Sequence, residues 1–324
     1  MSASLKPESP GAGSRIGIIV DANPSLGYGH VVRCLRLANA LTADTAVTFY
    51  PLSESCQDFL VNANSAGKLE ICKPDFETSV FPPLVITDLR ETHGITAAIH
   101  RNGSTHISIH DLGLAQCRSD VVIDGSVTTL FPYAPDKNRT LFLGPQYMVT
   151  REPVTRGDVT DTVLLTFGGG TTSKFALKAS EEAWNCGLMP VTTGGFIGSS
   201  PMTDPEFARA MATCRFAISG SGVTLYDLLA SGIPTIAVAF DRIQLRTADA
   251  FYERGAVLSA GLVERLAPAA LLRCCIEMLE NRSMAQRLSQ IGQMLVDGKG
   301  LSRVVEIVRR QLWLTSQVKT YSVC

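Results

Sequence analysis

The sequence lacks a long hydrophobic run, and no stretch of it is long enough to span a bilayer. It also lacks a surplus of charge, because 29 Lys and Arg residues stand against 30 Asp and Glu residues for a formal net charge of −1. This balance excludes a general electrostatic attraction to nucleic acid or to an anionic membrane surface. We therefore expect no nucleic-acid partner and no stable membrane association, so any phosphate binding must come from a local site.

The nine cysteines include no Cys-x-x-Cys pair, so the usual spacing of a zinc or redox motif is missing. Several of them, such as Cys34, Cys214 and Cys274, fall inside helical patterns, as is usual for buried reduced thiols. Residues 1–14 are polar and rich in Ser, Pro and Gly, which predicts a disordered tail rather than a secretion signal. We expect a cytoplasmic protein without a metal ion.

The rest of the chain favours two α/β domains. With 324 residues and 45% hydrophobic content, the chain is long enough for two separate cores. Short apolar runs alternate with helical patterns, and a polar segment with Pro and Gly at 150–158 is typical of a linker. We predict a Rossmann-like domain over 15–152, a second over 159–300, and a C-terminal helix and tail over 301–324. Facing domains would form a cleft at the carboxyl edges of their sheets.

The individual elements follow from the same patterns. Strands are expected in the first domain at 16–20, 45–50, 84–88, 106–110, 121–124 and 141–143. In the second domain they are expected at 163–167, 191–195, 216–219, 235–240 and 257–259, with helices at 173–186 and 205–213. Residues 266–315 are expected to be helical throughout.

A turn with two glycines and a histidine connects the first predicted strand to a helical pattern. The turn contains Gly27, Gly29 and His30. The apolar residues that recur beyond it at three- and four-residue intervals are Val31, Cys34, Leu35, Ala38 and Leu41. We predict that this helix begins within a residue or two of His30. The free backbone N–H groups and the positive end of the helix dipole then favour an anionic ligand such as phosphate.

The same positive end disfavours a protonated His30, which makes its imidazole a candidate general base. The alternative is that the glycines only form the turn and His30 is a polar residue of the first helical turn. The pattern is not a dinucleotide fingerprint, because the third glycine of GxGxxG and an acidic ribose partner after the next strand are both missing. NAD binding is therefore disfavoured.

Taken together, the motifs resemble the UDP-sugar hydrolases of pseudaminic acid biosynthesis, which are relatives of the B-type glycosyltransferases. The N-terminal signature is similar at Asp21, Gly27-Tyr28-Gly29-His30 and Arg33, and further similar stretches lie at 107–112, 143–147, 165–170 and 218–234. The resemblance spans most of the chain. It implies two Rossmann-like domains of the glycosyltransferase B-type fold.

The resemblance also implies site residues. The nucleotide-binding residues would be Gly168, Gly169, Ser219, Ser221, Gly222, Val223, Thr224, Asp227 and Gln244, with Asp227 on the ribose hydroxyls. The substrate-binding residues would be Asp21, Gly27, Tyr28, Gly29, Arg33, Asp88, Asp111 and Tyr147. Arg33 would meet a phosphate or a carboxylate. Some of them have a plainer interpretation: Asp88 and Asp111 can cap helices, Asp227 can be a solvated helix residue, and the glycines can simply form turns.

The implied reaction is hydrolysis of a UDP-linked deoxy amino sugar, with water activated by His30 and with no cofactor apart from the UDP of the substrate. The strongest alternative is an inverting glycosyltransferase, because water and an alcohol need the same base. A third possibility is a catalytically idle sugar-nucleotide binding protein. The chain has Asp88-Leu89-Arg90 where the hydrolases have an Asp-Ser-Tyr-like sequence, and His110 where the family often has a second aspartate. These departures leave the sugar open.

Overall fold

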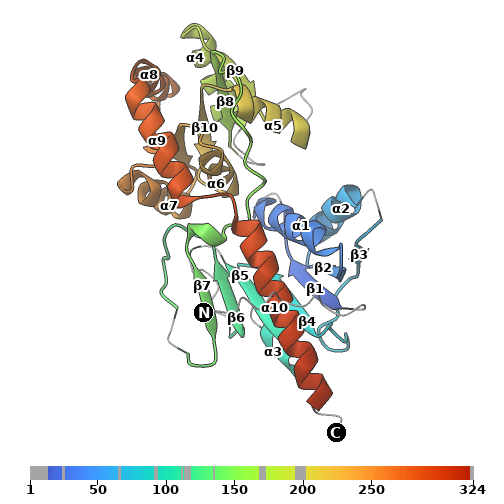
Figure 1. Ribbon diagram of the computed structural model, residues 1–324. Coiled ribbons are helices and arrows are strands. Elements are labelled where there is room, and N and C mark those ends of the chain that lie inside the picture. Colours follow the sequence, from blue (N-terminus) through green and yellow to red (C-terminus); the bar gives the residue numbers. More distant parts are fainter. Residues whose placement is uncertain are drawn as a thin grey trace. The chain divides into compact units, whose positions relative to one another are not determined.

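The computed structural model describes residues 14–23, 26–64, 67–90, 94–110, 112, 118–133, 136–167, 173–193 and 202–321. The chain divides into two compact units, as shown in Figure 1. Unit 1 comprises Met1–Val149 and Leu301–Cys324, and unit 2 comprises Thr150–Gly300. Apart from Ser14, the tail predicted at 1–14 lies outside the described residues. The facing of the two units across a cleft stays a prediction.

Unit 1 is built on a seven-stranded parallel sheet in the order β3-β2-β1-β4-β5-β6-β7. Its strands are β1 (Arg15–Val20), β2 (Ala46–Pro51), β3 (Glu70–Ile71), β4 (Leu84–Asp88), β5 (Thr105–His110), β6 (Val121–Asp124) and β7 (Thr140–Leu143). Its helices are α1 (Gly29–Leu41), α2 (Glu54–Ala63), α3 (Ile95–Arg101), the short 3₁₀ helix η1 (Pro145–Tyr147) and α10 (Gly300–Tyr321).

The core of unit 1 confirms the apolar patterns of the sequence. β4 is buried along its whole length, and β1 is buried from Ile16 onward, as expected for strands covered on both faces. Helix α1 begins at Gly29, within the predicted range, and buries Val31, Cys34 and Leu37 against the sheet. The register of the sheet places Val20 of β1 beside Asp88 of β4.

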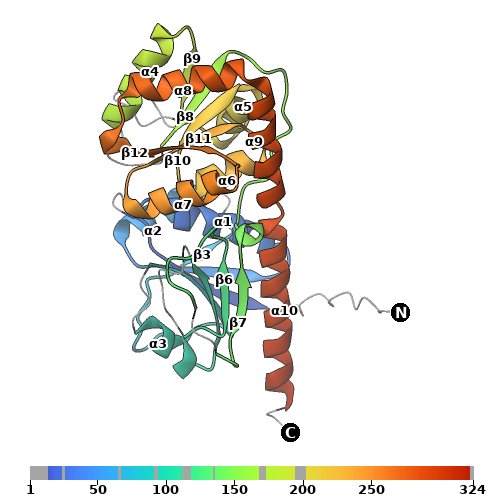
Figure 2. The same cartoon turned by 90° about the vertical axis from the view of Figure 1, so that its left-hand side faces the viewer.

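Helix α10 belongs to unit 1 rather than to the segment that precedes it in the chain. Val304, Val308 and Leu312 are buried in the same core as α1 and β1. Figure 2 shows this helix running alongside unit 1 for most of its length. The structure thereby corrects the prediction that 266–315 is helical throughout, because the helices there are separate and 296–299 is not helical.

Unit 2 is built on a five-stranded parallel sheet in the order β12-β11-β10-β8-β9. Its strands are β8 (Thr162–Thr166), β9 (Met189–Thr192), β10 (Phe216–Gly220), β11 (Thr235–Ala239) and β12 (Leu258–Leu262). Its helices are α4 (Ser173–Asn185), α5 (Asp204–Thr213), α6 (Val223–Ala230), α7 (Arg242–Glu253), the 3₁₀ helix η2 (Val263–Arg265), α8 (Pro268–Glu280) and α9 (Arg282–Leu295). The strand predicted at 191–195 is shifted, since β9 ends at Thr192.

Each sheet has one point where the strand order reverses. In unit 1 the chain moves from β1 outward to β2 and β3, and then returns to place β4 on the other side of β1. In unit 2 it moves from β8 to β9, and then places β10 on the other side of β8. Open α/β sheets bind ligands at the carboxyl ends of the strands at such a point. The turn that leads to His30 follows β1, and the turn at 221–222 follows β10.

Candidate active site

The turn after β1 is shaped by a glycine in the left-handed region. Gly27 has a φ of +82°, and its N–H donates to the Asn23 carbonyl oxygen at 2.8 Å. Tyr28 is the N-cap of α1, and no described side chain caps this helix end. The N–H groups of the first turn are therefore not engaged by a side-chain cap, as the anion-binding hypothesis requires.

Replacing Gly27 by alanine should destabilise unit 1 by about 1 kcal/mol or more, because an L-residue pays roughly 1–2 kcal/mol in the left-handed region. The effect comes from the backbone, since an added Cβ would meet no atom within 4 Å. Urea unfolding of Gly27→Ala measures it. Gly157→Ala is the matched control, because that glycine also has open space around it but no positive φ. Equal effects of the two substitutions would contradict the assignment.

His30 lies in the first turn of α1 and contacts the last residue of β4. Its Nδ1 is 2.6 Å from Asp88 Oδ1. The Asp88 side chain is fully buried, whereas 10% of the His30 side chain stays exposed. The contact joins residues 58 positions apart in the sequence. The two strand ends that meet at the reversal point of the sheet therefore bring together a candidate base and a carboxylate that can orient it.

Arg33 lies one helical turn after His30 and holds the same carboxylate in a fork. Its Nη2 donates to Asp88 Oδ1 at 2.5 Å, and its Nε donates to Asp88 Oδ2. The Cys34 thiol also points to Oδ2, with a sulfur-to-oxygen distance of 3.5 Å. We call His30, Arg33, Cys34 and Asp88 the His30 cluster. Arg33 was expected to meet a phosphate or a carboxylate, and the structure places it, 1% exposed, on the Asp88 carboxylate.

The charges of the His30 cluster fix the proton on the imidazole. Burial alone would raise the pKa of Asp88, but the Arg33 guanidinium and His30 outweigh burial and hold that pKa well below its usual range. Asp88 is therefore ionised and accepts only, so the proton between it and His30 belongs to Nδ1. In the neutral ring, Nε2 then carries the lone pair. None of the described residues hydrogen-bonds Nε2.

Cys34 takes no part as a nucleophile in this arrangement. Burial, followed by the nearby Asp88 carboxylate, raises the pKa of its thiol well above the usual range. The thiol remains protonated and donates to the carboxylate, so Asp88 accepts from three different side chains. A carboxylate with this many donors is held in one orientation, which gives Nδ1 of His30 a fixed acceptor.

Two further predicted residues of unit 1 lie at the same carboxyl edge of the sheet. Asp21 follows β1, and its Oδ1 accepts from the Ala22 N–H at 2.8 Å and from the Ser53 hydroxyl at 2.5 Å. The Tyr28 ring stacks on Phe59 with ring centroids 5.1 Å apart. Both residues stay partly exposed. The edge therefore presents an acidic and an aromatic side chain next to the turn that contains His30.

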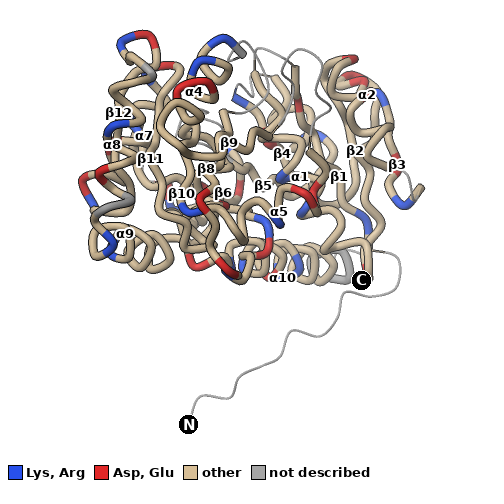
Figure 3. The backbone as a smooth tube through the Cα atoms, turned by 90° about the horizontal axis from the view of Figure 1, so that it is seen from above, with Lys and Arg blue, Asp and Glu red and all other residues tan. Residues whose placement is uncertain are grey.

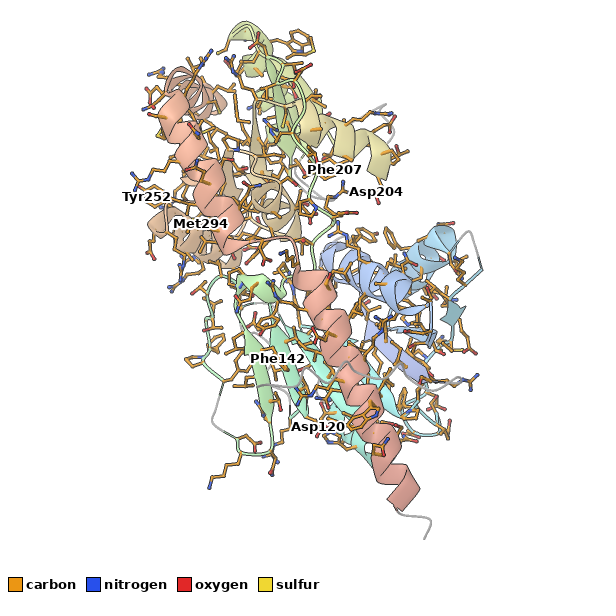
Figure 4. All side chains as sticks on the ribbon, in the orientation of Figure 1. Asp120, Phe142, Asp204, Phe207, Tyr252 and Met294 are labelled. Carbon is orange, nitrogen blue, oxygen red and sulfur yellow. The ribbon has the colours of Figure 1, made fainter. Side chains whose placement is uncertain are left out.

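Tyr147 has a different environment from the other predicted substrate residues. It belongs to the 3₁₀ helix η1 and packs edge-on against Phe142 of β7, with centroids 5.5 Å apart. Phe142 is labelled in Figure 4. Both rings pack against the main core of unit 1. This packing explains the presence of Tyr147 without a ligand.

In unit 2, the turn after β10 presents main-chain groups rather than hydroxyls. Ser219 donates its hydroxyl to the Gly220 carbonyl at 2.8 Å, and Ser221 donates to the Val238 carbonyl at 2.9 Å. Gly222, the N-cap of α6, has an extended backbone with open space where a Cβ would stand. No described side chain caps α6. The N–H groups at the start of α6, including those of Val223 and Thr224, remain as donors to an anion.

Asp227, which was predicted to bind the ribose hydroxyls, is buried and bonded to another part of unit 2. It is 2% exposed, and its Oδ1 accepts from the backbone N–H of Arg151 at 2.8 Å. The Arg151 guanidinium in turn donates to Asp204 at 2.7 Å and lies over the Phe207 ring at 4.7 Å, both on α5 and labelled in Figure 4. Asp227 therefore anchors the first residues of unit 2 to α6.

The remaining predicted nucleotide residue, Gln244, lies in the first turn of α7 at the carboxyl end of β11. Its backbone N–H donates to the N-cap residue Asp241 at 2.7 Å, and its side-chain oxygen accepts from the Phe240 N–H at 3.3 Å. The side chain thus folds back to the strand end. Predicted residues Asp111, Gly168 and Gly169 lie outside the described residues.

Several general properties of the site follow from the described part of the chain. Within it, no group of three or more His, Cys, Asp or Glu side chains has an arrangement that could hold a metal ion. No helix in the same residues is long and apolar enough to cross a bilayer. Figure 3 shows acidic and basic residues spread over both units, consistent with the near-zero net charge.

Comparison with known proteins places this geometry in a known fold. No family model matches the chain. MurG of Acinetobacter baumannii aligns over 92% of this chain and 99% of its own, with a TM-score of 0.62 and 11% identity. The MnaA–UDP co-structure from S. aureus aligns over 93% of this chain and 97% of its own, with a TM-score of 0.64 and 12% identity. The chain has the glycosyltransferase B-type fold. The predicted pair of Rossmann-like α/β domains is thereby confirmed.

The chain is also similar, over nearly its full length, to the spore coat polysaccharide biosynthesis protein SpsG of Bacillus subtilis (strain 168). It is 23% identical over 337 residues, which cover 91% of this chain and 97% of that protein. The calicheamicin glycosyltransferase CalG4 has a TM-score of 0.61 at 14% identity, over 93% of this chain and 98% of its own.

Within this B-type fold, sequence reasoning missed residues that complete the carboxyl edge of unit 1. Ser53 caps α2 and holds Asp21, and Phe59 stacks on Tyr28. Asp124 ends β6, and it accepts from the Tyr133 hydroxyl at 2.8 Å. The strand pattern of 121–124, ending in an acid, was a signal for Asp124, and a serine before a helical pattern was one for Ser53.

Proposed function

We propose that this protein is an enzyme that hydrolyses a UDP-linked deoxy amino sugar, releasing UDP and the free sugar for the synthesis of a pseudaminic-type acid. The observation that carries the proposal is the His30 cluster: an imidazole whose Nδ1 donates to an ionised carboxylate, leaving Nε2 able to accept a proton. The B-type fold, the motifs around His30 and the polysaccharide role in the name of SpsG support it.

The chemistry requires a base for water and an acceptor of negative charge for the leaving group. Nε2 of His30 removes a proton from water as the water oxygen forms a bond to the anomeric carbon. The bond from that carbon to the diphosphate oxygen breaks, and its electron pair leaves with UDP. Asp88 stabilises the imidazolium that forms, because Nδ1 already donates to it. UDP is a good leaving group, so no strong acid is needed.

Unit 2 would bind the nucleotide. The open N-terminus of α6 supplies main-chain donors from Gly222, Val223 and Thr224 for the diphosphate, where the helix dipole also favours negative charge. Asp227 already accepts a hydrogen bond from the Arg151 backbone, so we favour these main-chain donors over Asp227 as the nucleotide-binding groups. Two of the fold neighbours are known with a bound nucleotide: MnaA with UDP, and a 2-epimerase from Neisseria meningitidis with UDP-GlcNAc.

The second candidate is an inverting glycosyltransferase that uses a hydroxyl acceptor in place of water. The fold similarity to CalG4, a glycosyltransferase, favours it. The same His30 base would deprotonate the acceptor hydroxyl, so the His30 cluster is compatible with both reactions. An acceptor requirement distinguishes them.

Purified protein should release UDP from UDP-linked diacetamido-trideoxyhexoses without any acceptor, at least about 100-fold faster than its His30→Gln variant. In water enriched in oxygen-18, the heavy oxygen should appear in the free sugar, because water attacks the sugar carbon. UDP release that depends on an added hydroxyl compound would establish the transferase instead. If none of these sugars yields UDP under either condition, or if the sugar is epimerised while it stays linked to UDP, the proposal is wrong.

A further inference from the structure

We propose that Arg33 is a positioning residue for His30: it neutralises Asp88, so that this carboxylate orients the imidazole without drawing a proton onto Nε2. The proposal rests on His30 as the base of the proposed hydrolysis, and it assigns the control of His30 protonation to the Arg33 guanidinium. Arg33 would then act through Asp88 and His30, and would not touch the substrate.

The geometry places a positive and a negative charge at the same edge of the imidazole. Asp88 Oδ1 is 2.6 Å from Nδ1, and Arg33 Nη2 is 3.2 Å from the same nitrogen. A carboxylate alone at this position would stabilise the imidazolium and draw a proton onto Nε2. The guanidinium opposes this effect at nearly the same distance. Because Arg33 and Asp88 are each 1% exposed, water screens neither charge well.

The other groups that face the His30 ring do not offset the charge of Asp88 in place of Arg33. Among the described residues, α1 contributes Arg33 and Cys34 to the cluster, and β4 contributes Asp88. Cys34 carries no charge, since burial keeps its thiol protonated. The N–H groups at the start of α1 disfavour the imidazolium in the same direction as Arg33 but with partial charges only. The full charge that offsets the carboxylate therefore comes from Arg33.

The forked contact makes two substitutions informative. Arg33→Gln keeps a hydrogen-bonding side chain but removes the charge, so Asp88 acts on His30 without compensation. Arg33→Lys keeps the charge but loses the two-pronged geometry. A purely structural role would make both variants alike, whereas a charge effect separates them.

The experiment measures the imidazole titration of His30 by NMR and the pH dependence of kcat/KM for parent, Arg33→Lys and Arg33→Gln. His30→Gln identifies the His30 resonance by its absence. In Arg33→Gln, the titration midpoint should rise by about one pH unit or more, the usual effect of an adjacent charge. The acid limb of kcat/KM should move upward by the same amount. The Arg33→Lys midpoint should stay close to that of the parent.

The outcomes separate this inference from the proposed function. An unchanged midpoint in a folded Arg33→Gln variant overturns the role of Arg33. A raised midpoint without a matching move of the acid limb supports the charge effect but shows that His30 is not the base. If Arg33→Gln does not fold, Asp88→Asn and the double variant R33Q/D88N decide the question. The midpoint should fall in the first and return toward the parent in the second, and any other order contradicts the inference.

Discussion

Replacing His30 by alanine is expected to lower kcat by about two to four orders of magnitude and to leave the affinity for UDP largely unchanged. The imidazole would act on water in the chemical step, and the α6 N-terminus of the other unit would bind the diphosphate. The turnover of a UDP-linked substrate measures the first effect. Calorimetric titration with UDP measures the second.

His100→Ala is the matched control for this experiment. His100 lies at the end of α3, with 39% of its side chain exposed, and pairs with Asp120 at 3.4 Å rather than with the His30 cluster. Asp120 is labelled in Figure 4. We expect the control to retain the activity of the parent within about twofold, as is usual for surface substitutions. A His30→Ala variant as active as this control would remove His30 from the mechanism.

The parts of the fold that the sequence predicts are those whose signals are local. Parallel strands covered on both faces appear as apolar runs, so β1 and β4 were found within a residue or two of their bounds. The two-residue strand β3 carries no such run and was missed. The apolar stripe of α10 shows that one face is buried, but it does not show that the partner is the core of unit 1.

In the candidate site too, the features with local sequence signals were predicted and the long-range contacts were not. The glycine turn and the start of α1 follow from neighbouring residues, and both were found. The partners of the charged residues depend on contacts between distant segments. Arg33 and Asp88 are 55 positions apart, and Arg151 and Asp227 are 76 apart. Residue types suggested ligands for Arg33 and Asp227, whereas the folded chain supplies each of them with a partner of its own.

Removing one charge of the buried Arg33–Asp88 pair should therefore destabilise unit 1 strongly. Arg33→Gln removes the guanidinium that faces a carboxylate with no exposed surface, and Asp88→Asn removes the carboxylate that faces a buried guanidinium. Breaking a buried pair in this way typically costs about 3–5 kcal/mol. Urea unfolding, followed by the far-ultraviolet circular dichroism signal, measures the loss for each single variant.

The double variant R33Q/D88N should recover a large part of that loss, because two neutral amides can be buried together at much lower cost than one uncompensated charge. The amide oxygen that D88N introduces can still accept from His30 Nδ1, so the donor on the ring keeps a partner. Losses that simply add in the double variant would show that the two charges do not stabilise each other.

The pH dependence of the free energy of unfolding gives a second, independent test of the Arg33–Asp88 pair. Since the pKa of Asp88 is lowered in the folded chain, the stability from its ionised form is fully present above the unfolded pKa of about 4. That stability is lost as the pH falls below this value toward the lowered pKa, because the unfolded carboxylate then binds a proton that the folded one does not. The free energy of unfolding of the parent should thus decline below about pH 4 more steeply than that of the double variant, which has no carboxylate at this position.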